Sequence, residues 1–113
     1  MKNAEITETD ARDLQICEST GIRQWVLEQL RGPAKKHGIE KVILFGSRAR
    51  GDYRRESDID LAVSGGDADL FRLDVEEETD TLLQYDVVNL DHHLQPGLRE
   101  KIEEEGILLY EKV

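Results

Sequence analysis

The feature that most constrains the fold is a pair of apolar segments with different periodicity. Residues 42–45 read VILF, a continuous apolar run of strand length. Such a run is typical of a strand that is buried on both faces. Residues 58–63 read DIDLAV, so their apolar side chains share one face of a strand while Asp58 and Asp60 share the other. The two segments predict two strands, and the second of them carries a carboxylate pair on one face.

The rest of the chain supplies helices and two further strands. Apolar residues recur every four positions over residues 22–30, which predicts a helix that Gly32 and Pro33 should end or kink. A second helix is expected after Asp67, which is a suitable cap. Its apolar face is expected to contain the following residues: Ala68, Phe71, Val75, Thr79 and Leu82.

Residues 85–90 and 107–110 have the composition of strands, and the segment from Pro96 to Gly106 between them predicts a helix. The order of these elements favours an α/β (α+β) architecture in which a small mixed sheet has its helices on one face. We expect one domain over residues 20–113, preceded by a polar arm or short extra helix over residues 1–19.

Charge narrows the class of function. The 113-residue chain has a formal net charge of −10, which opposes direct binding to nucleic acid and suits metal ions or basic partners. Cys17 is the single cysteine, so neither an intrachain disulfide nor a cysteine-rich metal site is expected. The sequence contains no apolar run of membrane-spanning length, and we expect a cytoplasmic protein.

A phosphate and metal site is predicted over the segment from Gly46 to Asp60. Gly46 and Ser47 end the first strand, where free backbone N–H groups and a hydroxyl suit phosphate oxygens. Asp58 and Asp60 repel each other unless a hard cation binds both. The intervening residues 46–57 contain four arginines against two acidic residues, a local charge of +2 in an acidic chain. A solvated strand face and a basic surface loop remain the alternative interpretations.

These residues resemble a known family. The segment GSRARGDYRRESDIDLAV is similar to the signature of the polymerase-β-like nucleotidyltransferases, above all the minimal group: Gly-Ser, ten intervening residues, then Asp-x-Asp. Ser47 is followed by the ten residues 48–57 and then by Asp58. A weaker resemblance extends through YDVVNLDHHLQPGLREKIEEEGILLY, so that about residues 20–111 are covered. Tyr53 departs from the family pattern, which usually has a small residue there.

The resemblance implies the polymerase-β-like nucleotidyltransferase fold and a set of site residues. Asp58 and Asp60 are expected to hold two Mg²⁺ ions, or Mn²⁺, together with a third carboxylate on a neighbouring strand. Asp86 matches that position better than Asp80 or Asp91, because it alone lies within a predicted strand. The nucleotide-binding residues implied for ATP are Gly46, Ser47 and Arg48.

The resemblance also implies a biological role. Members of the minimal group commonly work beside a helical HEPN toxin as its antitoxin, and attach AMP from ATP to a tyrosine of that toxin. Two alternatives stay open from the sequence. The first alternative is a binding module that neutralises its partner by contact alone. The second is one subunit of a small-molecule nucleotidyltransferase.

Overall fold

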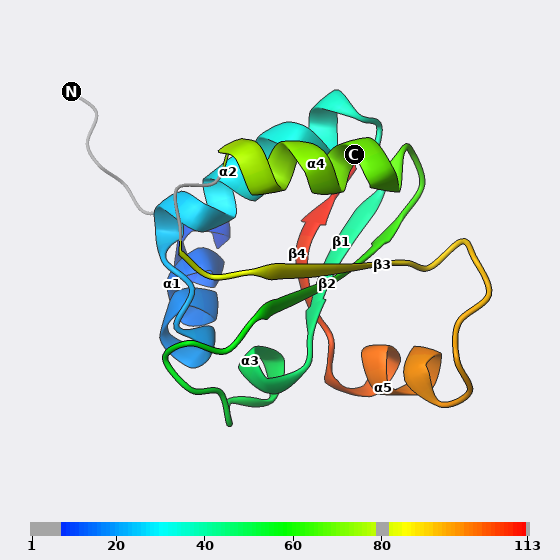
Figure 1. The fold of residues 1–113 in the computed structure, drawn as a ribbon. Helices are drawn as coiled ribbons and strands as arrows, with labels where there is room; N and C mark the ends of the chain where they lie inside the picture. Colours follow the sequence, from blue (N-terminus) through cyan, green and yellow to red (C-terminus); the bar gives the residue numbers. More distant parts are fainter. Residues whose placement is uncertain (1–7, 79–81, 113) are drawn as a thin grey trace.

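A four-stranded mixed sheet forms the centre of the protein (Figure 1). The computed structural model describes residues 8–78 and 82–112. The strands lie in the order β3-β2-β1-β4. β1 is antiparallel to both β2 and β4, whereas β2 and β3 are parallel. Their bounds are β1 Lys41–Phe45, β2 Ile59–Ser64, β3 Tyr85–Asn89 and β4 Ile107–Glu111.

Helices lie on both sides of this sheet. α2 (Gln24–Lys36) and α4 (Ala68–Glu78) contact each other over one face, and α5 (Leu98–Glu105) packs against β1 on the other (Figure 1). The mixed sheet is therefore confirmed, and the expected single helical layer holds for α2 and α4 but not for α5. α5 occupies the second face because Ile102 packs there with Phe45 and Ala62.

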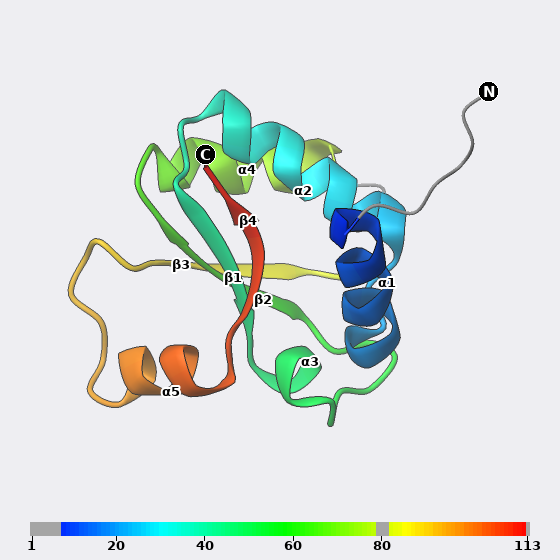
Figure 2. The ribbon, with the colours of Figure 1, turned by 180° about the vertical axis from the view of Figure 1, so that it is seen from behind.

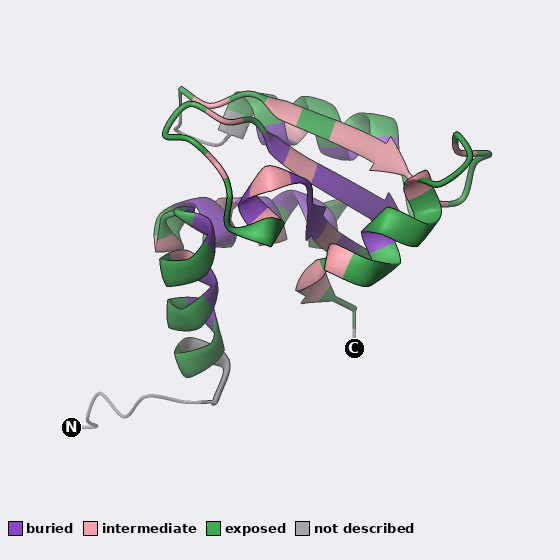
Figure 3. Ribbon diagram, turned by 90° about the horizontal axis from the view of Figure 1, so that it is seen from below, coloured by how far each residue is buried: buried purple, intermediate pink, exposed green. Residues whose placement is uncertain are grey.

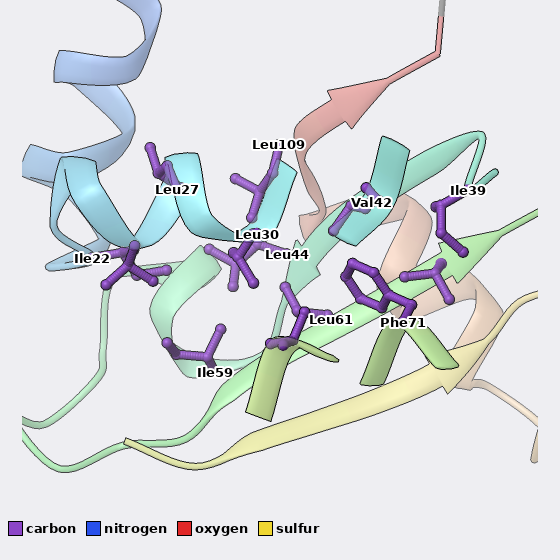
Figure 4. Packing of buried hydrophobic residues seen from close by; sticks show 14 of the residues in the cluster. Ile22, Leu27, Leu30, Ile39, Val42, Leu44, Ile59, Leu61, Phe71 and Leu109 are labelled. Atoms are coloured by element: carbon purple, nitrogen blue, oxygen red, sulfur yellow. The ribbon is translucent and has the colours of Figure 1, made fainter. Parts of the chain in front are cut away.

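The larger hydrophobic cluster lies between the sheet and the pair α2 and α4. The alternate residues Ile59, Leu61 and Val63 of β2 are fully buried in it, and Phe71 of α4 belongs to the same cluster (Figure 4). Figure 3 shows the same arrangement with each residue coloured by its burial. β2 is largely buried, while the outer faces of the helices are exposed. The period-two pattern thus separates the core face of β2 from the face that carries Asp60.

Two expectations about helix ends are corrected. Pro33 does not end its helix, because α2 continues to Lys36 with Pro33 inside it. Its last turn is held because Ala34 is fully buried and its carbonyl accepts the Ile39 N–H at 2.9 Å. Leu82 was expected on the core face of the second helix, but it lies beyond α4 and is fully exposed. Thr79, assigned to the same face, is outside the described residues.

Residues 8–20 form a helix that packs on the domain. α1 (Glu8–Thr20) lies beside α2 and near α3 (Ser47–Arg50), as the view from behind shows (Figure 2). Ile16 enters the larger cluster. The division at residue 19 into arm and domain stays a prediction. Within the described residues, no helix has the length and apolar character needed to cross a membrane.

One buried ion pair fastens α1 to α2. The Arg31 guanidinium donates to both carboxylate oxygens of Asp13, at 2.7 and 2.9 Å, and also to the Leu109 carbonyl of β4 at 3.0 Å. The Asp13 side chain is 5% exposed. The hydrogen bond from Arg31 is the main reason that the pKa of Asp13 lies below its ordinary value, although burial opposes this shift.

We expect Asp13→Asn to lower the free energy of unfolding by about 2 kcal/mol at pH 7, because it leaves the Arg31 charge without its carboxylate. The pKa of Asp13 is depressed in the folded protein, so this contribution is present above the unfolded pKa and is lost as pH falls through the folded pKa. The difference from wild type, measured by urea denaturation, should therefore shrink toward pH 3. Glu18→Gln on the exposed side of α1 is the control, and an equal effect of both substitutions would contradict the assignment.

Candidate nucleotide and metal site

The sheet brings two of the three predicted carboxylates side by side. Asp60 of β2 is the register partner of Asp86 in β3, and its partner on the other side is Phe45 of β1. Side chains at paired positions of a sheet share one face. Asp58 immediately precedes β2, two residues before Asp60. The parallel pairing of β2 with β3 therefore places all three carboxylates at the same end of the sheet, on the face that carries α5.

The three carboxylates differ in their exposure. Asp58 and Asp86 are exposed, whereas Asp60 is half-buried. Burial first, and repulsion from Asp86 and Asp58 second, raise the pKa of Asp60 to about 6 against an opposing effect of Arg50. A nearby cation would therefore stabilise the charged form of Asp60.

Gly46 packs its backbone directly against Asp60. A Cβ atom built on Gly46 would lie 2.1 Å from the Asp60 Oδ2, and the φ angle of +81° is one that other residues rarely adopt. Ser47, the next residue, begins α3. The Ser47 hydroxyl makes no hydrogen bond to the part of the chain that the structure describes, whereas its carbonyl accepts the Gly51 N–H at 2.9 Å.

Arg48 holds the loop that leads to Asp58. Its side chain is buried, and its guanidinium donates to the carbonyls of Thr20 at 2.9 Å, Ser57 at 3.0 Å and Arg55 at 3.1 Å. The same guanidinium lies over the Tyr53 ring, 4.9 Å from the ring centre. The nucleotide contact that the family resemblance implies for Arg48 stays a prediction. The Arg48 donors bond backbone carbonyls of the chain, so in this structure Arg48 positions the loop.

Arg50 and Glu105 form a contact that the sequence did not predict. The Arg50 guanidinium lies 3.3 Å from the Glu105 carboxylate and 3.3 Å from that of Asp52. Glu105 also accepts the Gly46 N–H at 2.7 Å. Glu105 ends α5, more than fifty residues from Gly46 in sequence, and no motif marks it. Only the packing of α5 on β1 brings it to the site.

Of the two competing carboxylates, Asp91 is not part of this group. Asp91 lies beyond the far end of β3, where its carboxylate accepts the Gly65 N–H at 2.7 Å. Asp80 is outside the described residues. Placement in the sheet therefore favours Asp86 as the third carboxylate.

Asp58, Asp60 and Asp86 suit a hard cation in two respects, the chemistry of their side chains and their common end of the sheet. All three are carboxylates, the oxygen donors that Mg²⁺ prefers, and no histidine or cysteine lies among them. Within residues 8–78 and 82–112, however, no three His, Cys, Asp or Glu side chains are close enough as they stand to hold one ion. The Asp58, Asp60 and Asp86 side chains would therefore have to turn toward an ion as it binds.

Two cavities that share lining residues lie beside the loop. One of about 440 Å³ is lined by Asp58, Arg55 and Leu83, among others. Arg55 and Leu83 also line a second of about 560 Å³, which extends to Trp25 and Tyr53. Asp58 thus opens onto a partly apolar hollow.

The sequence matches an established family over most of its length. The profile described as "Polymerase beta, Nucleotidyltransferase" matches residues 28–113. Two relatives from Methanocaldococcus jannaschii carry the provisional name protein adenylyltransferase. MJ0604 is 54% identical over 50 residues, which span 44% of this chain and 48% of the relative. MJ0435 is 34% identical over 76 residues, 64% of this chain and 81% of the relative. The chain thus matches about half the length of the first.

Solved structures share the fold. One, provisionally named a minimal nucleotidyltransferase, has a TM-score of 0.56 at 31% identity and covers 72% of this chain and 86% of its own. A crystal structure of a toxin–antitoxin with AMP-PNP has a TM-score of 0.60 at 23% identity, over 76% of this chain and 73% of the other. At that identity the second likeness shows the fold alone.

The contact between Gly46 and Asp60 generates a prediction with a control for strain. Gly46→Ala should lower the free energy of unfolding by about 3 kcal/mol or more, because backbone strain is joined by displacement of Asp60. Gly51→Ala also places alanine at positive φ, +90°, but its Cβ would meet nothing within 4 Å. We expect it to cost about 1–2 kcal/mol. Urea denaturation of both variants gives the comparison, and equal losses would show that Gly46 is only a turn residue.

The role of Arg48 generates a second prediction. Arg48→Lys should lower the free energy of unfolding by about 2–3 kcal/mol, because a lysine cannot reach the several carbonyls that the guanidinium bonds. Amide exchange at Ser57 and Asp58 should also become faster as the loop loosens. Arg55→Lys, at an exposed side chain of the same loop, is the control. Unchanged exchange in Arg48→Lys would argue against a positioning role.

Proposed function

Because the chain belongs to the polymerase β nucleotidyltransferase family, we propose that it transfers AMP from ATP to a hydroxyl group of a partner protein. The observation that carries the proposal is the direct pairing of Asp60 with Asp86 across β2 and β3, with Asp58 at the same end of the sheet. Two relatives named as protein adenylyltransferases support the reaction type, and a structure of the same fold was solved with AMP-PNP.

In this proposal the residues divide into three groups. Asp58, Asp60 and Asp86 hold two Mg²⁺ ions, or Mn²⁺, which when bound neutralise charge on the triphosphate and on the leaving group. Gly46 and Ser47 bind phosphate oxygens through a backbone N–H and a hydroxyl. Arg48 acts indirectly, because its bonds to the loop fix the position from which Asp58 enters the site.

The reaction is a substitution at the α-phosphorus of ATP. The acceptor oxygen forms a bond to that phosphorus, the bond from the phosphorus to the bridging oxygen breaks, and pyrophosphate leaves with the electron pair. The acceptor hydroxyl loses its proton to the Asp86 carboxylate, which passes it to solvent. Asp86 suits this role because it is exposed, so that a hydroxyl on a large partner is able to approach it.

We propose a tyrosine of a helical HEPN-type toxin as the acceptor, which makes this chain an antitoxin. The toxin–antitoxin structure with the same fold supports that assignment. The cavity beside Asp58 supports it as well, because Arg55, Leu83 and the other lining residues offer an aromatic side chain both apolar and cationic contacts.

Intact-mass analysis tests the proposal. The chain, incubated with ATP, Mg²⁺ and a HEPN-type protein encoded beside it, should add about 329 Da per AMP to that protein. Asp86→Asn should abolish the addition while the two proteins still associate, because docking and chemistry use different residues. Asp69→Asn, an exposed substitution on α4, should leave the addition unchanged.

The other outcomes separate the alternatives. An unmodified toxin that is nevertheless held in a tight, inhibited complex would replace the transferase proposal with an antitoxin that acts by contact. Release of pyrophosphate with AMP attached only to a small molecule would identify a small-molecule nucleotidyltransferase instead.

A further inference from the structure

The Glu105 carboxylate lies near Asp60, at a position where two donors of the protein bind an anion. One of its carboxylate oxygens accepts the Gly46 N–H at 2.7 Å, and the Arg50 guanidinium lies 3.3 Å from both oxygens. The Glu105 side chain is only 16% exposed, whereas that of Arg50 is 44% exposed. A backbone donor and a cationic side chain thus converge on one carboxylate that the fold itself supplies.

This position is electrostatically unusual. Glu105 is close enough to Asp60 to be one of the charges that raise the pKa of that residue. A fourth carboxylate beside three others is unfavourable unless its own donors compensate it. The Gly46 N–H and the Arg50 guanidinium provide that compensation, so these two donors define a place where negative charge is stabilised.

We propose that Glu105 is an internal competitor of the nucleotide, and that its carboxylate must leave the Gly46 N–H and Arg50 when a phosphate group of ATP binds. This inference rests on the proposed function, because it assigns the same two donors to the triphosphate. A single N–H cannot donate a linear hydrogen bond to two anions at once, so the two occupants exclude each other.

Replacement of the Glu105 carboxylate by a phosphate group keeps the hydrogen bonds of the same two donors. A carboxylate and a phosphate oxygen accept the same charge-assisted hydrogen bonds, and a guanidinium binds either group through two donors. Displacement of Glu105 therefore moves an anion away from Asp60 as another anion arrives with its metal ions. Once displaced, Glu105 needs no new partner in the protein, because it ends α5 and water is able to solvate it.

Isothermal titration of ATP in the presence of Mg²⁺ tests this competition. Glu105→Gln should lower the Kd for ATP roughly three- to tenfold, because a neutral amide competes less well for Gly46 and Arg50. Glu104→Gln is the matched control: it removes the same charge from the neighbouring, exposed position of α5. Glu105→Asp keeps the charge but shortens the side chain by one methylene group, and it should also lower the Kd.

Thermal unfolding supplies a readout that a merely structural role would not move. Without nucleotide, Glu105→Gln should have a lower Tm than wild type, because it weakens the contact with Gly46 and Arg50. With saturating Mg²⁺ and ATP the difference should shrink, since the wild-type carboxylate has then left that contact as well. An equal loss of Tm in both conditions would overturn the proposal.

The titration distinguishes failure of this inference from failure of the proposed function. ATP binding by wild type, with Glu105→Gln and Glu105→Asp binding no more tightly than Glu104→Gln, would overturn the competition alone. The absence of ATP binding by every one of these folded proteins would overturn both. If Glu105→Gln does not fold, the Kd of Glu105→Asp against wild type decides the matter by itself.

Discussion

The main physical constraint on the candidate site is the repulsion among the carboxylates that the sheet brings together. Asp60 is fixed beside Asp86 by the register of β2 and β3, and backbone hydrogen bonds hold that register regardless of the charges. The two backbone positions cannot separate without breaking the ladder, so only rotation of the side chains changes the distance between the carboxylates. Cationic groups near the sheet end relieve part of this repulsion. Burial is the larger cause of the raised pKa of Asp60, and repulsion from Asp86 and Asp58 adds to it.

Two arginines of the 46–57 loop, Arg48 and Arg50, have different roles beside these carboxylates. Arg48 is buried and satisfies carbonyls of the loop and of Thr20, so it determines where the chain runs but leaves its charge remote from solvent. Arg50 is exposed and pairs with Glu105 and Asp52, so its charge faces the site and opposes the rise in the Asp60 pKa. Residues of the same type, two positions apart, thus have separate tasks because one points inward and the other outward.

Local patterns predicted the strands and the end of β1 at Gly46, because strand periodicity and the end of a buried strand are encoded within a few residues. Long-range packing was not encoded in this way. The helix around Pro33 continues because buried contacts of its last turn outweigh the missing N–H, and Leu82 follows α4 rather than extending its apolar face. Glu105 reaches the site only because β4 returns beside β1 and leaves the end of α5 next to Gly46.

Because β4 returns beside β1, the end of α5 lies next to the 46–57 loop, where Glu105 accepts the Gly46 N–H. Gly106 separates α5 from β4, and a side chain there would meet the Ile102 carbonyl and the Ile43 side chain at 2.4 and 2.6 Å. The close approach at Gly106 therefore determines how deeply the end of α5 sits against β1, and with it the reach of Glu105 to the Gly46 N–H. In the proposed competition, the packing of a helix that contains none of the predicted site residues would control the access of an external phosphate to donors that Glu105 occupies.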